Sequence, residues 1–135
     1  MTSKVIYKGE LRTECTHIRS SNIIQTDAPI DNQGKGETFS PTDLVATALA
    51  SCILTIMGIK ARDKGISMEG ATAEVIKEMG DQPRRISAIR IKIIMPDLPF
   101  TDKEKLLLQK AADHCPVGRS LHPDLEEDVQ IIWAQ

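Results

Sequence analysis

The sequence predicts an α+β protein in which antiparallel strands surround one long, buried central helix. Segments with alternating polar and apolar residues fill the first third of the chain and recur between residues 71 and 95. Residues 44–59 are apolar on nearly every side of a helix, which is typical of a helix with no solvent-facing side. With 135 residues the chain is long enough for one core, so we expect a single domain over residues 1–135.

The first third of the chain has the pattern of three short strands. We expect them at residues 4–8, 11–18 and 22–26, with turns at Gly9 and at residues 20–22. Residues 27–37 bring Pro, Asn, Asp and Gly close together, which predicts a loop.

The central helix has clear start and stop signals. Ser40 is placed as N-cap, Pro41 occupies the first helical position, and Asp43 follows three residues after the cap. Gly65 is placed to end the helix at about residue 64. Small residues along it allow another element to approach closely.

The second half of the chain adds strands and a second helix. We expect strands at residues 71–79 and 86–95, joined by a turn at residues 80–83. Thr101 and Glu104 form a second capping box, which predicts a helix to about residue 114 that Pro116 stops. A short helical turn to residue 121 and a last strand at residues 128–133 complete the expected order.

Charge and composition disfavour several classes of function. A formal net charge of −2 and dispersed basic residues give no footprint for nucleic acid or an anionic membrane. We find no run of about 18 apolar residues and no signal-peptide pattern at the N-terminus, so we expect a cytoplasmic protein. Aromatic residues make up only 3%, so the core must be aliphatic.

Three cysteines, Cys15, Cys52 and Cys115, are an odd number in a reducing compartment, which favours catalytic thiols over structural disulfides. Cys52 lies in the middle of the apolar helix, where a buried, inert cysteine is the competing interpretation. Cys115 precedes Pro116 and is placed as the N-cap of a short helix, which ranks it as the more acidic thiol; an ordinary helix-breaking Cys-Pro step is the alternative. Nothing near Cys15 activates it.

A metal or cofactor site receives little support. His17, His114 and His122 accompany the cysteines, but no pair has the spacing of zinc ligands. The glycines at positions 34 and 36 lack the strand and the longer pattern of a phosphate loop. We therefore expect no metal and no cofactor.

Two segments carry a resemblance to a known family. Residues 40–52, SPTDLVATALASC, and residues 114–121, HCPVGRSL, resemble the two cysteine motifs of the OsmC/Ohr family, the osmotically inducible and organic hydroperoxide resistance proteins. The expected order of elements also suits that family, so the resemblance covers essentially the whole chain. It implies the OsmC-like fold and an intertwined homodimer with its active sites at the subunit interface.

The resemblance also implies a reaction. In that family the cysteine matching Cys52 attacks a hydroperoxide, and the cysteine matching Cys115 closes a disulfide with it, which a small dithiol, of the lipoyl type in some members, reduces again. These roles reverse the acidity ranking above, and we follow the family. An arginine held by a glutamate completes the family's site. Arg12 is the best placed arginine here, with Arg19 as the alternative, and Asp43 stands near the family's glutamate position.

Two further interpretations stay open. The chain could be a non-catalytic module that binds an acyl or thiol compound, or senses redox state, because Asp43 departs from the family's glutamate. It could also be a structural dimer whose cysteines never meet.

Overall fold

The structure is a computed structural model that describes residues 1–134 and divides the chain into two compact units, residues 1–45 and 46–135. The sequence analysis expected one domain over this length.

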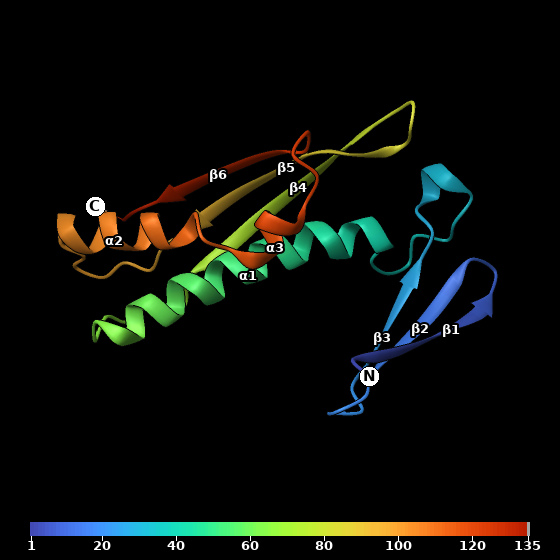
Figure 1. Ribbon diagram of the computed structural model, residues 1–135, viewed down its shortest axis with the longest axis horizontal. Helices are drawn as coiled ribbons and strands as arrows, with labels where there is room; N and C mark the ends of the chain where they lie inside the picture. Colours follow the sequence, from blue (N-terminus) through green and yellow to red (C-terminus); the bar gives the residue numbers. More distant parts are fainter. Residues whose placement is uncertain (135) are drawn as a thin grey trace. The chain divides into compact units, whose positions relative to one another are not determined.

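The first unit is a three-stranded antiparallel sheet in the order β1-β2-β3 (Figure 1). Its strands are β1 (Ser3–Gly9), β2 (Arg12–His17) and β3 (Ile23–Asp27), within one or two residues of the expected ranges. The expected loop follows β3 and contains one short 3-10 turn, η1 (Ile30–Asn32). Within residues 1–45 no hydrophobic side chain is buried, and the buried residues are Thr26, Asp27 and Ser40.

The central helix α1 (Pro41–Asp63) begins at the predicted capping box. The Asp43 backbone N–H donates to the Ser40 hydroxyl at 3.0 Å, and the Ser40 N–H donates to the Asp43 carboxylate at 3.0 Å. These reciprocal bonds satisfy two backbone donors that a helix start otherwise leaves open. Gly65 follows the helix with φ of +68°, a conformation that favours glycine.

The second unit contains the sheet β4-β5-β6, formed by β4 (Thr72–Gly80), β5 (Arg85–Ile94) and β6 (Glu126–Ile132). The β4 and β5 strands pair antiparallel as expected, whereas β6 runs parallel to β5. The expectation of purely antiparallel sheets is therefore wrong for this strand. The reason is the connection: the chain leaves β5, passes through α2 (Asp102–Ala112) and α3 (Pro116–Ser120), and returns to pair in the same direction.

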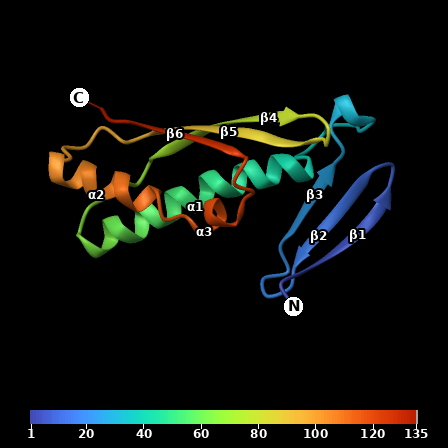
Figure 2. The same ribbon diagram turned by 45° about the horizontal axis from the view of Figure 1, so that its top comes forward.

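The helices of the second unit lie on one face of its sheet (Figures 1 and 2). Ile89, Ile91 and Ile93 of β5 alternate toward this face and are almost fully buried, while the residues between them face outward. They form one aliphatic cluster with α1, α2 and Cys115; the other buried members are Ala46, Leu49, Ala50, Ile53, Met57, Ala61, Met95 and Leu108. This cluster fixes α1 against the start of α3.

One face of α1 stays exposed within the second unit. Ala48, Ser51, Thr55 and Ile59, four residues that share one side of the helix, are all exposed, Ile59 to 53%. By length and composition α1 could cross a membrane: an 18-residue window has a mean hydropathy of 1.9 and is 33% buried. The sequence analysis found no such segment, because Ala, Thr, Ser and Gly interrupt the strongly apolar residues. Core helices of other proteins meet the same test.

Candidate functional site

Cys115 is the N-cap of α3, as the sequence predicted. Its backbone is extended, Pro116 takes the first helical position, and the Gly118 N–H donates to the Cys115 sulfur at 3.4 Å. The residue is only 4% exposed and belongs to the aliphatic cluster. The short helix therefore presents this sulfur inward.

Cys52 lies against the same cluster from α1 and is half-buried. It neighbours Cys115 closely enough to raise the pKa of that thiol. Two cysteines 63 positions apart in the sequence thus meet in the second unit. Their proximity disfavours the interpretation in which the cysteines never meet, and both thiols are free in this structure.

The predicted acidity of Cys115 is wrong. Burial raises the pKa of the Cys115 thiol above its ordinary value, and the neighbouring Cys52 raises it further. The N–H groups of Gly118 and Val117 act in the opposite direction, but they do not compensate for the burial. A helix of one turn supplies those donors without the field of a long helix, so desolvation decides the sign.

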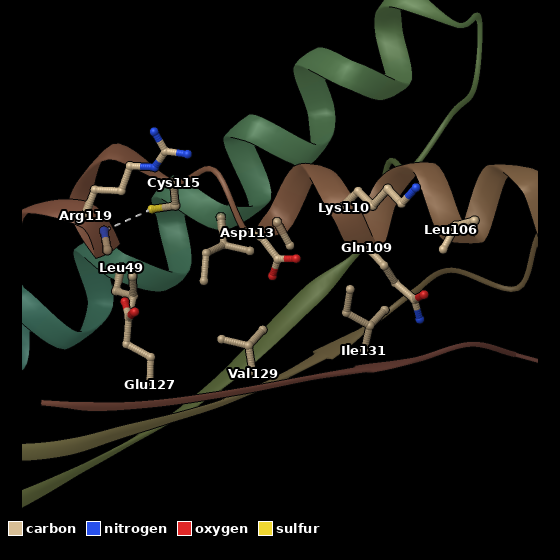
Figure 3. Close-up of a pocket in the computed structure, with 13 residues that line it drawn as sticks. Leu49, Leu106, Gln109, Lys110, Asp113, Cys115, Arg119, Glu127, Val129 and Ile131 are labelled. Atoms are coloured by element: carbon tan, nitrogen blue, oxygen red, sulfur yellow. Dashed lines mark hydrogen bonds between the residues drawn. The ribbon is translucent and has the colours of Figure 1, made fainter. Parts of the chain in front are cut away.

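Cys115 lies in the wall of a pocket of about 620 Å³ (Figure 3). Its apolar side comes from α1, α2 and β6; the residues are Leu49, Ile53, Leu106, Ala112, Val129 and Ile131. Charged residues complete the wall, namely Lys110, Asp113, Arg119 and Glu127. Arg119 contacts the His114 ring nitrogen Nδ1 at 2.7 Å. The pocket thus joins an apolar surface and several charges beside a buried thiol.

Glu127 is a pocket residue that the sequence analysis did not single out. Burial raises the pKa of its carboxyl group above the ordinary value. The sequence analysis began the last strand at residue 128, so the alternation that turns Glu127 toward the helices could not be seen.

A second cluster of functional interest lies in the first unit, around Arg12. Arg12 and Asp27 are directly opposite each other in the β2–β3 pairing. The guanidinium of Arg12 donates two hydrogen bonds to the Asp27 carboxylate, at 2.7 and 2.8 Å, and also contacts Glu37 at 3.5 Å. The Asp27 carboxylate, 1% exposed, accepts a further bond from the Glu37 N–H at 3.1 Å. The hydrogen bond from Arg12 lowers the pKa of Asp27 below its ordinary value.

This arrangement changes the expected acidic partner of Arg12. The sequence analysis assigned that part to Asp43, whereas the structure pairs Arg12 with Asp27 and Glu37. Asp43 belongs to the capping box of α1, and its role in a reaction stays a prediction. Arg19 lies in the exposed turn between β2 and β3, so Arg12 is the arginine whose position is fixed by a buried carboxylate.

The remaining candidates lie apart from these clusters. Cys15 is half-buried within β2, and its sulfur lies 3.8 Å from the Thr13 hydroxyl. In the part of the chain that the structure describes, no three His, Cys, Asp or Glu side chains gather into a possible metal site.

The chain is similar to proteins of a known family, both in sequence and in fold. A family model described as OsmC-like protein matches residues 34–128, which is most of the chain. The chain belongs to the OsmC family. The matched region contains both Cys52 and Cys115.

Solved structures support the OsmC fold over the full length. A Psychrobacter arcticus protein, provisionally named for osmotic stress induction and detoxification response, is 54% identical with a TM-score of 0.93, covering 98% of this chain and 96% of that one. A Legionella pneumophila OsmC protein named for organic hydroperoxide resistance is 16% identical, with a TM-score of 0.75 and coverage of 97% and 96%. OhrB of Bacillus subtilis, also an organic hydroperoxide resistance protein, is 17% identical, with a TM-score of 0.68 and 98% of both chains covered. The two distant proteins show a shared fold. Among curated proteins, no match is found.

Proposed function

We propose that this protein is a thiol peroxidase that reduces organic hydroperoxides through Cys52 and Cys115. The observation that carries the proposal is the proximity of these two thiols, one half-exposed and one buried, in an OsmC-family chain. The names of the Legionella and Bacillus proteins, which share the fold, support organic hydroperoxides as the substrate class.

The proposed reaction has three steps. The Cys52 thiolate attacks the terminal oxygen of the hydroperoxide; the O–O bond breaks, an alcohol leaves, and Cys52 becomes a sulfenic acid. The Cys115 sulfur then attacks the Cys52 sulfur, the S–O bond breaks, and water leaves as the disulfide forms. A small dithiol reduces the disulfide by two exchange steps and restores both thiols.

Exposure supports this division of roles between the cysteines. A nucleophile must meet its substrate, and Cys52 is the more exposed of the two. Cys115 is buried, with its pKa raised, so it holds its proton and reacts poorly with small molecules from solvent. Its sulfur needs only to reach the sulfur of Cys52, which is its neighbour in the second unit.

We assign Arg12 as the cation of the proposed site. The family resemblance supports this role, and the two bonds to Asp27 give the guanidinium one fixed orientation, as a group that stabilises a thiolate requires.

We also propose that the working protein is a homodimer. Both the first unit, which buries no hydrophobic side chain, and the exposed face of α1 need a second copy to cover them.

The direct test is consumption of cumene hydroperoxide by the reduced protein with dithiothreitol or dihydrolipoamide. We expect turnover that Cys52→Ser abolishes and that Cys15→Ser, the matched control, leaves unchanged. Without added dithiol, Cys115→Ser should still consume one equivalent per site and then accumulate a sulfenic acid that dimedone traps. Retained turnover in Cys52→Ser would refute the proposal.

The pocket beside Cys115 favours one second candidate, the binding of an acyl or thiol compound without turnover. Its apolar wall and charged residues suit an amphipathic ligand of moderate size. Calorimetric binding of a fatty acid to the protein, together with no loss of any hydroperoxide, would favour this candidate over the peroxidase.

A further inference from the structure

Glu127 faces away from the charge network that holds its two neighbours. Glu126 and Asp128 both contact Arg90 of β5, at 3.1 and 3.3 Å. Side chains alternate along a strand, so Glu127 points to the opposite face of the sheet, where the helices lie. Figure 3 shows its carboxylate directed from β6 toward Leu49 and α3.

The Glu127 carboxylate has no hydrogen-bond or ion-pair partner among residues 1–134. Its pKa is raised by burial alone, with no cation to offset the loss of water. Glu127 is an exposed residue, so this burial is partial, and ionisation of its carboxyl group costs the folded chain only part of what a fully buried charge would. Such costs are typical of groups that have a chemical task.

The same residue, Gly118, contacts both Glu127 and the Cys115 sulfur. Gly118 donates its N–H to Cys115, and a methyl group built on Gly118 would come within 2.7 Å of the Glu127 carboxylate oxygen Oε1. The Glu127 carboxylate thus lies beside the backbone of Gly118, and a side chain at position 118 would displace it. Glu127 and Cys115 also line one pocket. The carboxylate and the buried thiol therefore both adjoin Gly118 in the wall of one pocket.

We propose that Glu127 is the proton acceptor for the Cys115 thiol in the step that closes the Cys52–Cys115 disulfide. This inference rests on the proposed function. The Cys115 proton passes to the Glu127 carboxylate, directly or across one water molecule, and the electron pair left on sulfur forms the S–S bond. The S–O bond of the Cys52 sulfenic acid breaks, and the leaving oxygen takes up the proton and departs as water.

Other charged groups face the same space and compete for this role. Asp113 at the end of α2 directs its carboxylate into the pocket, and Lys110 of α2 and Arg119 of α3 add positive charge to the wall (Figure 3). Asp113 and Glu127 are both exposed residues, and both line the pocket that contains Cys115. Asp113 is therefore the alternative base that the experiment must separate from Glu127.

The test measures disulfide closure without a peroxide. In a Cys15→Ser background, the reduced protein is mixed with 5,5′-dithiobis(2-nitrobenzoate). The half-exposed Cys52 forms a mixed disulfide and releases one thionitrobenzoate. Attack by Cys115 then forms the Cys52–Cys115 disulfide and releases a second. The rate of the second release, followed from pH 5 to 10, is the rate at which Cys115 reacts.

We expect Glu127→Gln to slow the second release roughly 100-fold at neutral pH, the scale of a lost general base. The wild-type rate should level off once Glu127 is ionised, whereas the variant's rate should keep rising until hydroxide itself ionises Cys115. Glu126→Gln, on the other face of the strand, is the matched control and should match the wild type. A merely structural role for Glu127 would not change the pH profile.

Equal rates for Glu127→Gln and wild type at every pH would overturn the proposal, as would a loss seen in Asp113→Asn instead. Failure of the proposed function would give a different result. A wild-type protein that closes the disulfide with this reagent but consumes no hydroperoxide would refute the peroxidase activity and leave the role of Glu127 in disulfide closure intact.

Discussion

Two carboxylates of this protein show how a neighbouring cation decides the direction in which a carboxyl pKa shifts. Asp27 is almost fully buried, yet the hydrogen bond from Arg12 lowers its pKa. Glu127 has no such partner, and burial raises its pKa. The first acid therefore stays ionised and orients an arginine, whereas the second exchanges a proton more readily.

The raised pKa of Glu127 makes a stability prediction with a definite sign. Between the ordinary pKa of about 4.5 and the higher folded value, the folded chain binds more protons than the unfolded chain, so the free energy of unfolding falls as pH rises. We expect Glu127→Gln to raise the melting temperature at pH 7 and to lose this advantage near pH 4. Thermal denaturation at both pH values measures it, with Glu126→Gln as control. A destabilised variant at pH 7 would contradict the assigned environment.

Asp27 and Asp43 can be separated by substitution. We expect Asp27→Asn to lower kcat/KM for hydroperoxide roughly 10- to 100-fold, because Arg12 loses the charge that orients it. Asp43→Asn should chiefly lower the melting temperature, since it weakens the capping box of α1. Kinetics and thermal denaturation of both variants decide between them. The opposite pattern would return the acidic role to Asp43.

Single residues were the least predictable level from the sequence. The motifs around Cys52 and Cys115 identified both thiols, but the acidity of Cys115 depended on burial that one segment does not reveal. The pairing of Arg12 with Asp27 depends on strand register, and no spacing along the chain predicts register.

Helix caps were the most predictable elements. Both capping boxes follow from four-residue patterns, and the bonds of Thr101 with Glu104 are present at 2.8 and 3.1 Å. Strand ranges agreed to within about two residues because alternation marks them. The parallel direction of β6 was not predictable, because it depends on how α2 and α3 return the chain to the sheet.

The cap of α2 gives a prediction at this scale. Thr101→Ala removes the acceptor for the Glu104 N–H and should cost about 1 kcal/mol, or roughly 3–5 °C in melting temperature. Hydroperoxide turnover at 25 °C should not change. Differential scanning calorimetry checks the first statement and the peroxide assay the second. An unchanged melting temperature would show that tertiary packing alone fixes this helix end.

At the scale of the whole molecule, the exposed apolar surface calls for a partner. The first unit buries none of its hydrophobic side chains, and α1 exposes a face of small and apolar residues beside Cys52. A three-stranded sheet with no packed apolar face is not stable alone. A second copy of the chain is the partner that we propose.

Sedimentation equilibrium of the purified protein should therefore give twice the 14.9 kDa of one chain. Ile59→Lys places a charge on the exposed face of α1 and should weaken the association. A wild-type protein that sediments as a monomer at micromolar concentration would exclude the dimer.

The central claim is that Cys52 and Cys115 act as one redox pair, and mass spectrometry tests it most directly. One equivalent of cumene hydroperoxide is added to the reduced protein, and the products are alkylated, digested and mapped without reductant. The account predicts a loss of two hydrogens per chain and a crosslinked peptide pair containing Cys52 and Cys115, with Cys15 alkylated. An unchanged mass, or oxidation confined to Cys15, would contradict it.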